Sequence, residues 1–451
     1  MWPLRRGPGI ESHVRTSHIG RLLAVSALTM LPAFGAPSAQ AVSPPGVDDR
    51  WLPKPALPAP PRPTVQREVC AALAVDSGPG PNRPPRAFDL SEVWQLTRGA
   101  GQRVAVIDTG ISRHRRLPDV VPGGDYVSTG DGTQDCDAHG TLVAGIIAAT
   151  ADSKSDGFSG IAPEATLISI RQSSAKFAPA GERSRIGVGD VDSMAKAVRT
   201  AADLGASVIN ISSVACVPAA SALDDRALGA ALAYAVDVKN AVVVAAAGNT
   251  GGAAQCPPQP PDATWQTISV AVSPAWYDDY VLTVGSVDAN GAPSAFSLAG
   301  PWVDVAAPGE AVTSLAPEPV SGTSYAAPVV SGLAALIRAR FPALTAHQVM
   351  RRIETTAHHP PAGRDSLVGN GTIDPLAAVS TGTGPPAHTP GAPPAAVPAA
   401  APPPATPPRD TRARDTAVRG AAICLIALAL ALAAGAARSR LRGPRDGVAG
   451  D

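Results

Sequence analysis

Three polar residues stand on glycine-rich turns that are far apart in the chain. Asp108 lies in VAVIDTG, His139 in AHGTLVAGIIA and Ser324 in VSGTSYAAPVVSG. A serine hydroxyl attacks a carbonyl carbon when a histidine takes its proton and a carboxylate fixes the tautomer of the imidazole. If the fold brings these turns together, Ser324 is the nucleophile, His139 the base and Asp108 its partner. The three residue types therefore predict acyl transfer.

Two of these residues, Asp108 and Ser324, also have a purely structural interpretation. An aspartate after a strand often forms a turn, and a serine at the start of a helix often caps it. Ser324 opens a helix whose apolar residues recur at helical spacing, and helix N-termini supply N–H donors and positive potential to an oxyanion. His139 also opens an apolar helix, where the helix dipole disfavours a cation and favours a neutral base.

The elements that must position these residues alternate along the chain. Short runs rich in Val, Ile and Ala, such as RVAVID, ATLISI and AVVVAAA, are separated by helical stretches. Strands that are apolar throughout are buried on both faces, which is typical of a parallel sheet covered by helices on both sides. We expect an α/β domain over residues 88–378, with Asp108 at the carboxyl edge of the sheet, where ligands bind. The polar stretch 172–190 is expected to be a surface loop.

The quoted motifs resemble the three catalytic blocks of the subtilisin-like serine proteases, peptidase family S8. The order Asp, His, Ser is also that of subtilisin. A fourth stretch, VVVAAAGNTG, resembles the family segment whose Asn contributes to the oxyanion hole, here Asn249, and VDVAAPGE resembles the segment before the nucleophile. The resemblance covers roughly residues 88–378. It implies a subtilisin-like fold, with a mostly parallel sheet flanked by helices, and serine endopeptidase activity.

One segment departs from the family pattern. After the strand SVIN the chain reads ISSVACV, where the family often has Ser-Leu-Gly-Gly. We expect Ser212 to offer backbone groups to an extended substrate. Val214 replaces a small glycine and is expected to narrow the neighbouring subsite. Acidic clusters suited to calcium are not obvious, so we predict no metal and no cofactor.

Both ends of the chain have the character of targeting segments. Arginines, an apolar run and small residues before Ala41 are typical of a secretory signal peptide, with an uncleaved anchor as the alternative. The segment GAAICLIALALALAAGAA is long enough to cross a membrane, and the arginines after it place the C-terminus in the cytoplasm and the catalytic domain outside. The predicted order is signal peptide (1–41), Pro-rich arm (42–87), peptidase domain (88–378), Pro/Ala-rich linker (379–417), transmembrane helix (418–437) and Arg-rich tail (438–451).

Export would expose four of the five cysteines to an oxidising environment. Cys424 lies in the predicted span and is expected to be a free thiol. The other four allow three pairings, of which we favour those between neighbours in sequence, Cys70–Cys136 and Cys216–Cys256. The first pair would tether the arm beside the predicted active site, so we expect a permanent arm and not a discarded inhibitor.

The order of segments resembles that of the mycosins, membrane-anchored proteases of actinobacterial type VII secretion systems. This resemblance implies a role in type VII protein secretion, with protein or peptide substrates and with membrane components of the secretion system as partners. Two alternatives remain: a structural component of the secretion complex in which proteolysis is dispensable, and a general extracellular protease. The chain has 37 basic and 37 acidic residues, and this zero net charge gives no reason to expect a nucleic-acid partner.

Overall fold

The fold is described from a computed structural model of the chain. The described residues are 42–381, without 72, 81–87, 153–156, 183–186, 222, 253–254 and 362. The predicted signal peptide, transmembrane helix and tail lie outside them, as does nearly all of the predicted linker. Among the described residues, no helix combines the length and the apolar character needed to cross a membrane.

Seven strands form the central sheet, and every pair of neighbours runs parallel. They are β2 (Arg103–Asp108), β3 (Val120–Asp125), β4 (Thr166–Arg171), β6 (Val208–Ile211), β8 (Val242–Ala246), β10 (Leu282–Val287) and β11 (Val305–Pro308). Their order across the sheet is β11-β10-β8-β6-β2-β4-β3. The inner strands are buried along their whole length, which explains their uninterrupted apolar runs. The predicted parallel sheet is therefore confirmed.

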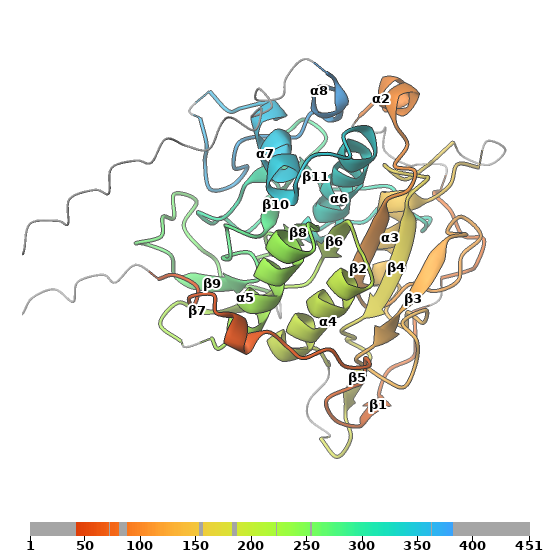
Figure 1. Cartoon of the computed structure of the whole chain (residues 1–451), viewed down its shortest axis with the longest axis vertical. Coiled ribbons are helices and arrows are strands. Elements are labelled where there is room, and N and C mark those ends of the chain that lie inside the picture. Colours follow the sequence, from red (N-terminus) through yellow and green to blue (C-terminus); the bar gives the residue numbers. More distant parts are fainter. Residues whose placement is uncertain are drawn as a thin grey trace, which may run out of the picture. The chain divides into compact units, whose positions relative to one another are not determined.

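Helices cover both faces of this sheet (Figure 1). After β2 the chain forms β3 at the edge of the sheet and comes back through α3 (His139–Ala148) to β4, which lies between β2 and β3. It then passes through α4 (Val191–Asp203) to β6 and through α5 (Arg226–Ala233) to β8. α4 packs against α5 on one face of the sheet, and α3 lies on the other face (Figure 1). The remaining helices are α2 (Ser91–Leu96), α6 (Thr323–Arg340), α7 (Ala346–Thr356) and α8 (Pro375–Val379), and a π-helical turn, η2 (Tyr234–Val238), continues α5.

α6 is surrounded by other elements. It packs against α3 and therefore shares its face of the sheet, and it contacts β6, β8, β10 and β11. A helix that is apolar on all sides is typical of such a buried position. The apolar positions expected from the sequence are all buried, namely Ala327, Val330, Leu333, Ala334 and Ile337. This packing fixes the residues at the start of α6 in a rigid frame.

The Pro-rich arm crosses the surface in a largely extended conformation. It contains two short elements, the 3₁₀ turn η1 (Asp49–Trp51) and the strand β1 (Thr64–Gln66). β1 pairs antiparallel with β5 (Phe177–Pro179), which lies inside the stretch 172–190. The expectation of a surface loop there was therefore wrong in part, because the arm supplies the backbone hydrogen bonds that turn this stretch into a strand. A second two-stranded antiparallel sheet joins β7 (Ala215–Pro218) to β9 (Val270–Ser273).

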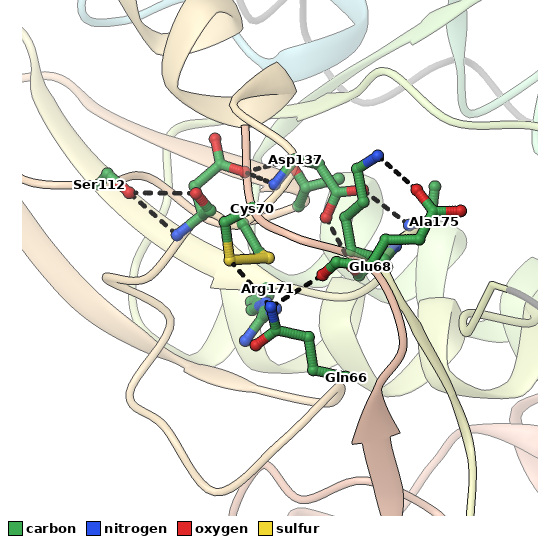
Figure 2. Close-up of a disulfide and its surroundings, with 12 residues drawn as sticks. Gln66, Glu68, Cys70, Ser112, Asp137, Arg171 and Ala175 are labelled. Carbon is green, nitrogen blue, oxygen red and sulfur yellow. Dashed lines mark hydrogen bonds and ion pairs between the residues drawn. A yellow bond between two sulfur atoms is a disulfide. The ribbon is translucent and has the colours of Figure 1, made fainter. Parts of the chain in front are cut away.

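A disulfide fixes the arm to the loop that precedes α3. Cys70 bonds to Cys136, as favoured from the sequence. Beside it, Ala71 N donates to Cys136 O at 2.8 Å, and Lys176 pairs with Glu68 at 2.7 Å. Figure 2 shows the disulfide with Glu68 of the arm close by. The arm is thus held by a covalent bond, by strand pairing and by an ion pair.

Candidate active site

Asp108 is the last residue of β2 and is almost fully buried. Its Oδ1 accepts hydrogen bonds from Thr109 N and from His139 Nδ1, both at 2.7 Å. Because a carboxylate can only accept, Nδ1 carries the proton, and the lone pair of the neutral imidazole lies on Nε2. In this tautomer Nε2 is the ring atom that can accept a proton.

His139 is the first residue of α3, and tight backbone packing sets its position. The preceding Ala138 has a positive φ of 65°, so the chain turns sharply into the helix. The next residue must be glycine, because a Cβ on Gly140 would lie 2.1 Å from the carbonyl oxygen of Gly110. The start of α3 therefore lies directly against the turn that follows Asp108.

The charges around His139 favour its protonated form. Burial lowers the pKa of the imidazole, but the charge and hydrogen bond of Asp108 raise it, and the charges of Asp135 and Asp137 add to that effect. The net result is a pKa above the ordinary value of histidine. A raised pKa makes the neutral imidazole a stronger base and stabilises the cation that forms once it has taken a proton.

Ser324 lies in the first turn of α6 but does not cap it. Gly322 is the N-cap, with a φ of 152°, and no side chain hydrogen-bonds there as a cap. A Cβ on Gly322 would lie 3.0 Å from Ser324 Oγ, so glycine leaves the space beside the hydroxyl open. The capping interpretation of Ser324 was therefore wrong. The rings of Tyr325 and His139 lie 5.1 Å apart between centroids, which places the start of α6 beside the base.

Asn249 follows β8 and faces the start of α6. Its Oδ1 accepts hydrogen bonds from Thr323 N at 2.9 Å and from Thr323 Oγ1 at 3.0 Å. These bonds fix the carboxamide, so its Nδ2 group points to the other side and lies 3.5 Å from the position of a Cβ on Gly322. Asn249 Nδ2 and Ser324 Oγ thus both border the space beside Gly322.

A chain of hydrogen bonds connects the end of β6 to Ser324. Ser212 Oγ donates to the carbonyl of Ser324, and Asn210 Nδ2 donates to Ser212 Oγ, both at 2.9 Å. Ser331 Oγ donates to Asn210 Oδ1 at 2.8 Å. The carbonyl of Ser324 is open to Ser212 because Pro328, four residues further on, has no N–H to donate to it. The sequence suggested only a backbone role for Ser212, and it did not point to Asn210 or Pro328.

The second disulfide lies between the segments that carry Ser212 and Asn249. Cys216 on β7 bonds to Cys256, the other pair favoured from the sequence. Cys256 N also donates to the carbonyl of Asn249 at 2.9 Å. The bond therefore links the segment after Ser212 to the one after Asn249.

A cavity of about 180 Å³ adjoins the Ser212 segment. One wall is formed by Ser213, Val214 and Ala215, and the others come from the start of α4, from Leu228 of α5 and from Pro274. Val214 thus lines this cavity, and the expected narrowing of a substrate subsite stays a prediction. Because the cavity begins next to Ser212, whose hydroxyl contacts Ser324, it is the candidate position for a substrate side chain.

Buried carboxylates in and around this region bond to protein groups. Asp225, for example, accepts hydrogen bonds from Trp276 Nε1 and Tyr277 Oη, each at 2.8 Å. Within the part of the chain that the structure describes, no group of three or more His, Cys, Asp or Glu side chains is placed to hold a metal ion.

The fold and these residues define a serine-type endopeptidase of the subtilisin-like class. The chain belongs to the subtilase family, whose sequence profile matches residues 99–371, and within that family to the mycosins. It is 70% identical to Mycosin-4 of Mycobacterium tuberculosis over 455 residues, which cover 97% of this chain and 100% of that protein. The resemblance inferred from the sequence motifs is thereby confirmed.

Solved structures agree with this assignment. The MycP3 protease from the type VII (ESX-3) secretion system superposes with a TM-score of 0.68 at 45% identity, covering 75% of this chain and 100% of that one. A chain of the intact ESX-5 inner membrane complex superposes with a TM-score of 0.69 at 40% identity, covering 88% of this chain and 100% of that one.

Proposed function

We propose that this chain is a membrane-anchored endopeptidase that hydrolyses peptide bonds with Asp108, His139 and Ser324 and acts in type VII protein secretion. The observation that carries the catalytic part is the 2.7 Å hydrogen bond from His139 Nδ1 to Asp108 Oδ1, at the position where α6 brings in Ser324. Asn249, fixed by Thr323, adds a donor on the side where an oxyanion would form.

In the first half of the reaction, His139 Nε2 takes the proton of Ser324 Oγ, which attacks the carbonyl carbon of the peptide. Asp108 stabilises the imidazolium that results, and Asn249 Nδ2 donates to the oxyanion. The imidazolium then gives its proton to the leaving amine, and the acyl group remains on Ser324. In the second half, water attacks the acyl-enzyme with the same base and releases the acid and the free serine.

The placement at the membrane rests on the sequence and on the relatives. The predicted signal peptide, the span at 418–437 and the arginines after it would hold the catalytic domain outside the cytoplasm. Relatives of this chain are named as components of type VII secretion systems and of an ESX inner membrane complex. An anchored protease with a tethered arm suits the cleavage of a few exported proteins better than general extracellular digestion.

The test uses the full chain and a fluorophosphonate probe, which forms a covalent bond only with an activated serine. We expect rapid labelling of the wild type and none of Ser324→Ala, with equal melting temperatures. No labelling of the wild type, or equal labelling of both, would contradict the catalytic proposal.

A second arm of the experiment separates catalysis from a structural role in the secretion complex. Cells that lack the protein are complemented with the wild type or with Ser324→Ala, and secretion is measured for both. If Ser324→Ala restores secretion without labelling, the chain supports the complex independently of proteolysis. If it fails to restore secretion although it folds and reaches the membrane, the proteolytic activity is required.

A further inference from the structure

Asp135 is a buried carboxylate between the turn after Asp108 and the start of α3. It is 9% exposed and lies in the loop that leads to His139. No part of the mechanism above uses it, and its motif was not singled out from the sequence. Four donors converge on its two oxygens, which is the largest number that a carboxylate readily accepts.

One oxygen reaches the turn that carries Asp108. Thr109 Oγ1 donates to Asp135 Oδ1 at 2.8 Å, and Asp137 N donates to the same atom at 3.1 Å. Thr109 Oγ1 in turn accepts from Gly140 N at 2.9 Å. The Thr109 hydroxyl has a single proton, which it donates to Asp135. A lone pair of the hydroxyl oxygen is therefore left to accept the N–H of Gly140. The backbone N–H of Thr109 already bonds to Asp108, so this hydroxyl lies one residue from the partner of the base.

The other oxygen holds the first turn of α3. Asp135 Oδ2 accepts from Thr141 N at 2.8 Å and from Thr141 Oγ1 at 2.7 Å. The N-cap of this helix is Ala138, which has no polar side chain, so Asp135 supplies the acceptor that a capping residue would normally provide. A negative charge there is also favoured by the helix dipole. His139 is the first residue of that turn.

These hydrogen bonds form a continuous chain from Asp108 to the helix turn that carries His139. Starting at Asp108, they pass through Thr109 to Asp135 and through Thr141 to the helix turn of His139. The direct contact between His139 and Asp108 is therefore supported by a second connection through Thr109, Asp135 and Thr141.

We propose that Asp135 is a positioning residue, which fixes the Asp108 turn and the start of α3 relative to each other and so holds His139 in the orientation needed for proton transfer. This inference rests on the proposed function, since it assigns Asp135 a part in the same site. Asp135 acts through His139 and is not itself a catalytic residue.

Burial in this position disfavours the charged form of Asp135. Burial raises the pKa of Asp135 to about 6, against the opposing hydrogen bonds of Thr141 and Thr109, and the charge of Asp108 adds to the rise. The charged or titratable groups that face it are Asp108, Asp137, His139 and Tyr325. A residue that served only to stabilise the fold would gain little from a buried carboxylate beside another one.

The test measures labelling of the full chain by a fluorophosphonate, resolved into the maximal rate kinact and the concentration constant KI. In Asp135→Asn we expect kinact to fall about tenfold to a hundredfold, which is at or below the lower end of the roughly 10²–10⁴-fold that general acid–base catalysis contributes, because the base is displaced and not removed, while KI stays unchanged. The matched control is Asp304→Asn, since Asp304 is a buried carboxylate that accepts from Thr283 N at 2.8 Å and pairs with Arg364 at 3.2 Å, and it lies before β11, at the edge of the sheet opposite to that of Asp108. That variant should leave kinact unchanged.

A second pair of variants decides the matter if Asp135→Asn does not fold. Thr109→Val removes the hydroxyl that links Asp135 to the Asp108 turn, whereas Thr109→Ser keeps it. We expect a lower kinact for valine and recovery for serine. Equal kinact for valine and serine, or an unchanged kinact in folded Asp135→Asn, would overturn the inference. Absence of labelling in the wild type would instead contradict the proposed function itself.

Discussion

At the scale of single residues, the site depends on hydrogen bonds that fix the direction of each polar group. Asp108 accepts from Nδ1 of His139 and so leaves Nε2 free for the nucleophile. Asn249 gives both lone pairs of its Oδ1 to Thr323 and so turns its N–H groups toward Ser324. In each case a second contact decides which atom of an ambiguous side chain faces the reaction.

Asn249→Asp tests this directional role. Aspartate keeps an acceptor for Thr323 but replaces the N–H donor with an oxygen, and its negative charge would repel the oxyanion. We expect the rate to fall by at least about 10²–10³, the typical cost of one lost oxyanion-hole donor. The measurement is peptide-bond or ester hydrolysis together with the melting temperature. A rate close to that of the wild type would show that Asn249 does not donate to the oxyanion.

The raised pKa of Asp135 predicts that its contribution to the stability of the folded protein falls as the pH rises. Its pKa in the folded protein is about 6, above the value of about 3.9 for an unperturbed aspartate. The folded state therefore binds more protons than the unfolded state between these values, and this residue makes the protein less stable as the pH rises through that window. Asp135→Asn cannot ionise there. The difference in melting temperature, wild type minus Asp135→Asn, should fall from pH 4 to pH 7, and a constant or rising difference would contradict the assignment.

At the scale of secondary-structure elements, α6 and β6 are joined where the helix lacks one of its own hydrogen bonds. Pro328 leaves the carbonyl of Ser324 without its usual partner, and Ser212 at the end of β6 supplies one. The hydrogen bond thus links the end of β6 to Ser324. Helix and strand can then move only together at this point, which favours a constant distance between substrate and Ser324.

Ser212→Ala should weaken both stability and catalysis. It leaves the carbonyl of Ser324 and Nδ2 of Asn210 without this partner, at a cost of about 1–3 kcal/mol for a buried unsatisfied group. We also expect slower fluorophosphonate labelling, because Ser324 is less firmly held. Adding Pro328→Ala restores an N–H for the carbonyl of Ser324, so the double variant should regain stability. If the second substitution lowers stability further, the carbonyl was not the group left unsatisfied.

At the scale of the whole molecule, the arm and the catalytic domain form one folded unit over the described residues. The disulfide Cys70–Cys136 joins the arm to the loop that leads to His139, and β1 adds a strand to β5. Further along, Gly80 N donates to the carbonyl of Pro317 at 3.1 Å. The arm thus contacts segments that lie far apart in the sequence.

A cut between the arm and the catalytic domain should not release the arm. A specific protease site is introduced between residues 84 and 85, the full chain is cleaved, and its mass is measured with and without a reductant. We expect the arm to remain attached until Cys70–Cys136 is reduced. The control is the double variant Cys70→Ser with Cys136→Ser, in which only non-covalent contacts can hold the arm. Release of the arm from the cleaved wild type without reduction would disprove the covalent tether.

Much of this protein could be read from its sequence, because the information is local. Apolar strands and helices predicted the parallel sheet, and the glycine-rich motifs around Asp108, His139, Ser324 and Asn249 predicted both the family and the candidate site. Glycine is required at such turns by close backbone approach, as at Gly140, or by a positive φ, as at Gly322, so it leaves a signal within a few residues.

Only the tertiary structure decided how distant residues act on one another. Ser324 proved not to be a cap, the stretch 172–190 gained a strand from the arm, and Ser212 acts through its hydroxyl because Pro328 frees a carbonyl. No sequence motif indicated a role for Asp135, because that role depends on four hydrogen bonds that it accepts from Thr109, Asp137 and Thr141 in the folded chain. The physical reason is common to all of them. A hydrogen bond depends on atoms being within about 3 Å in space, and sequence spacing does not record that proximity once the chain has folded back on itself.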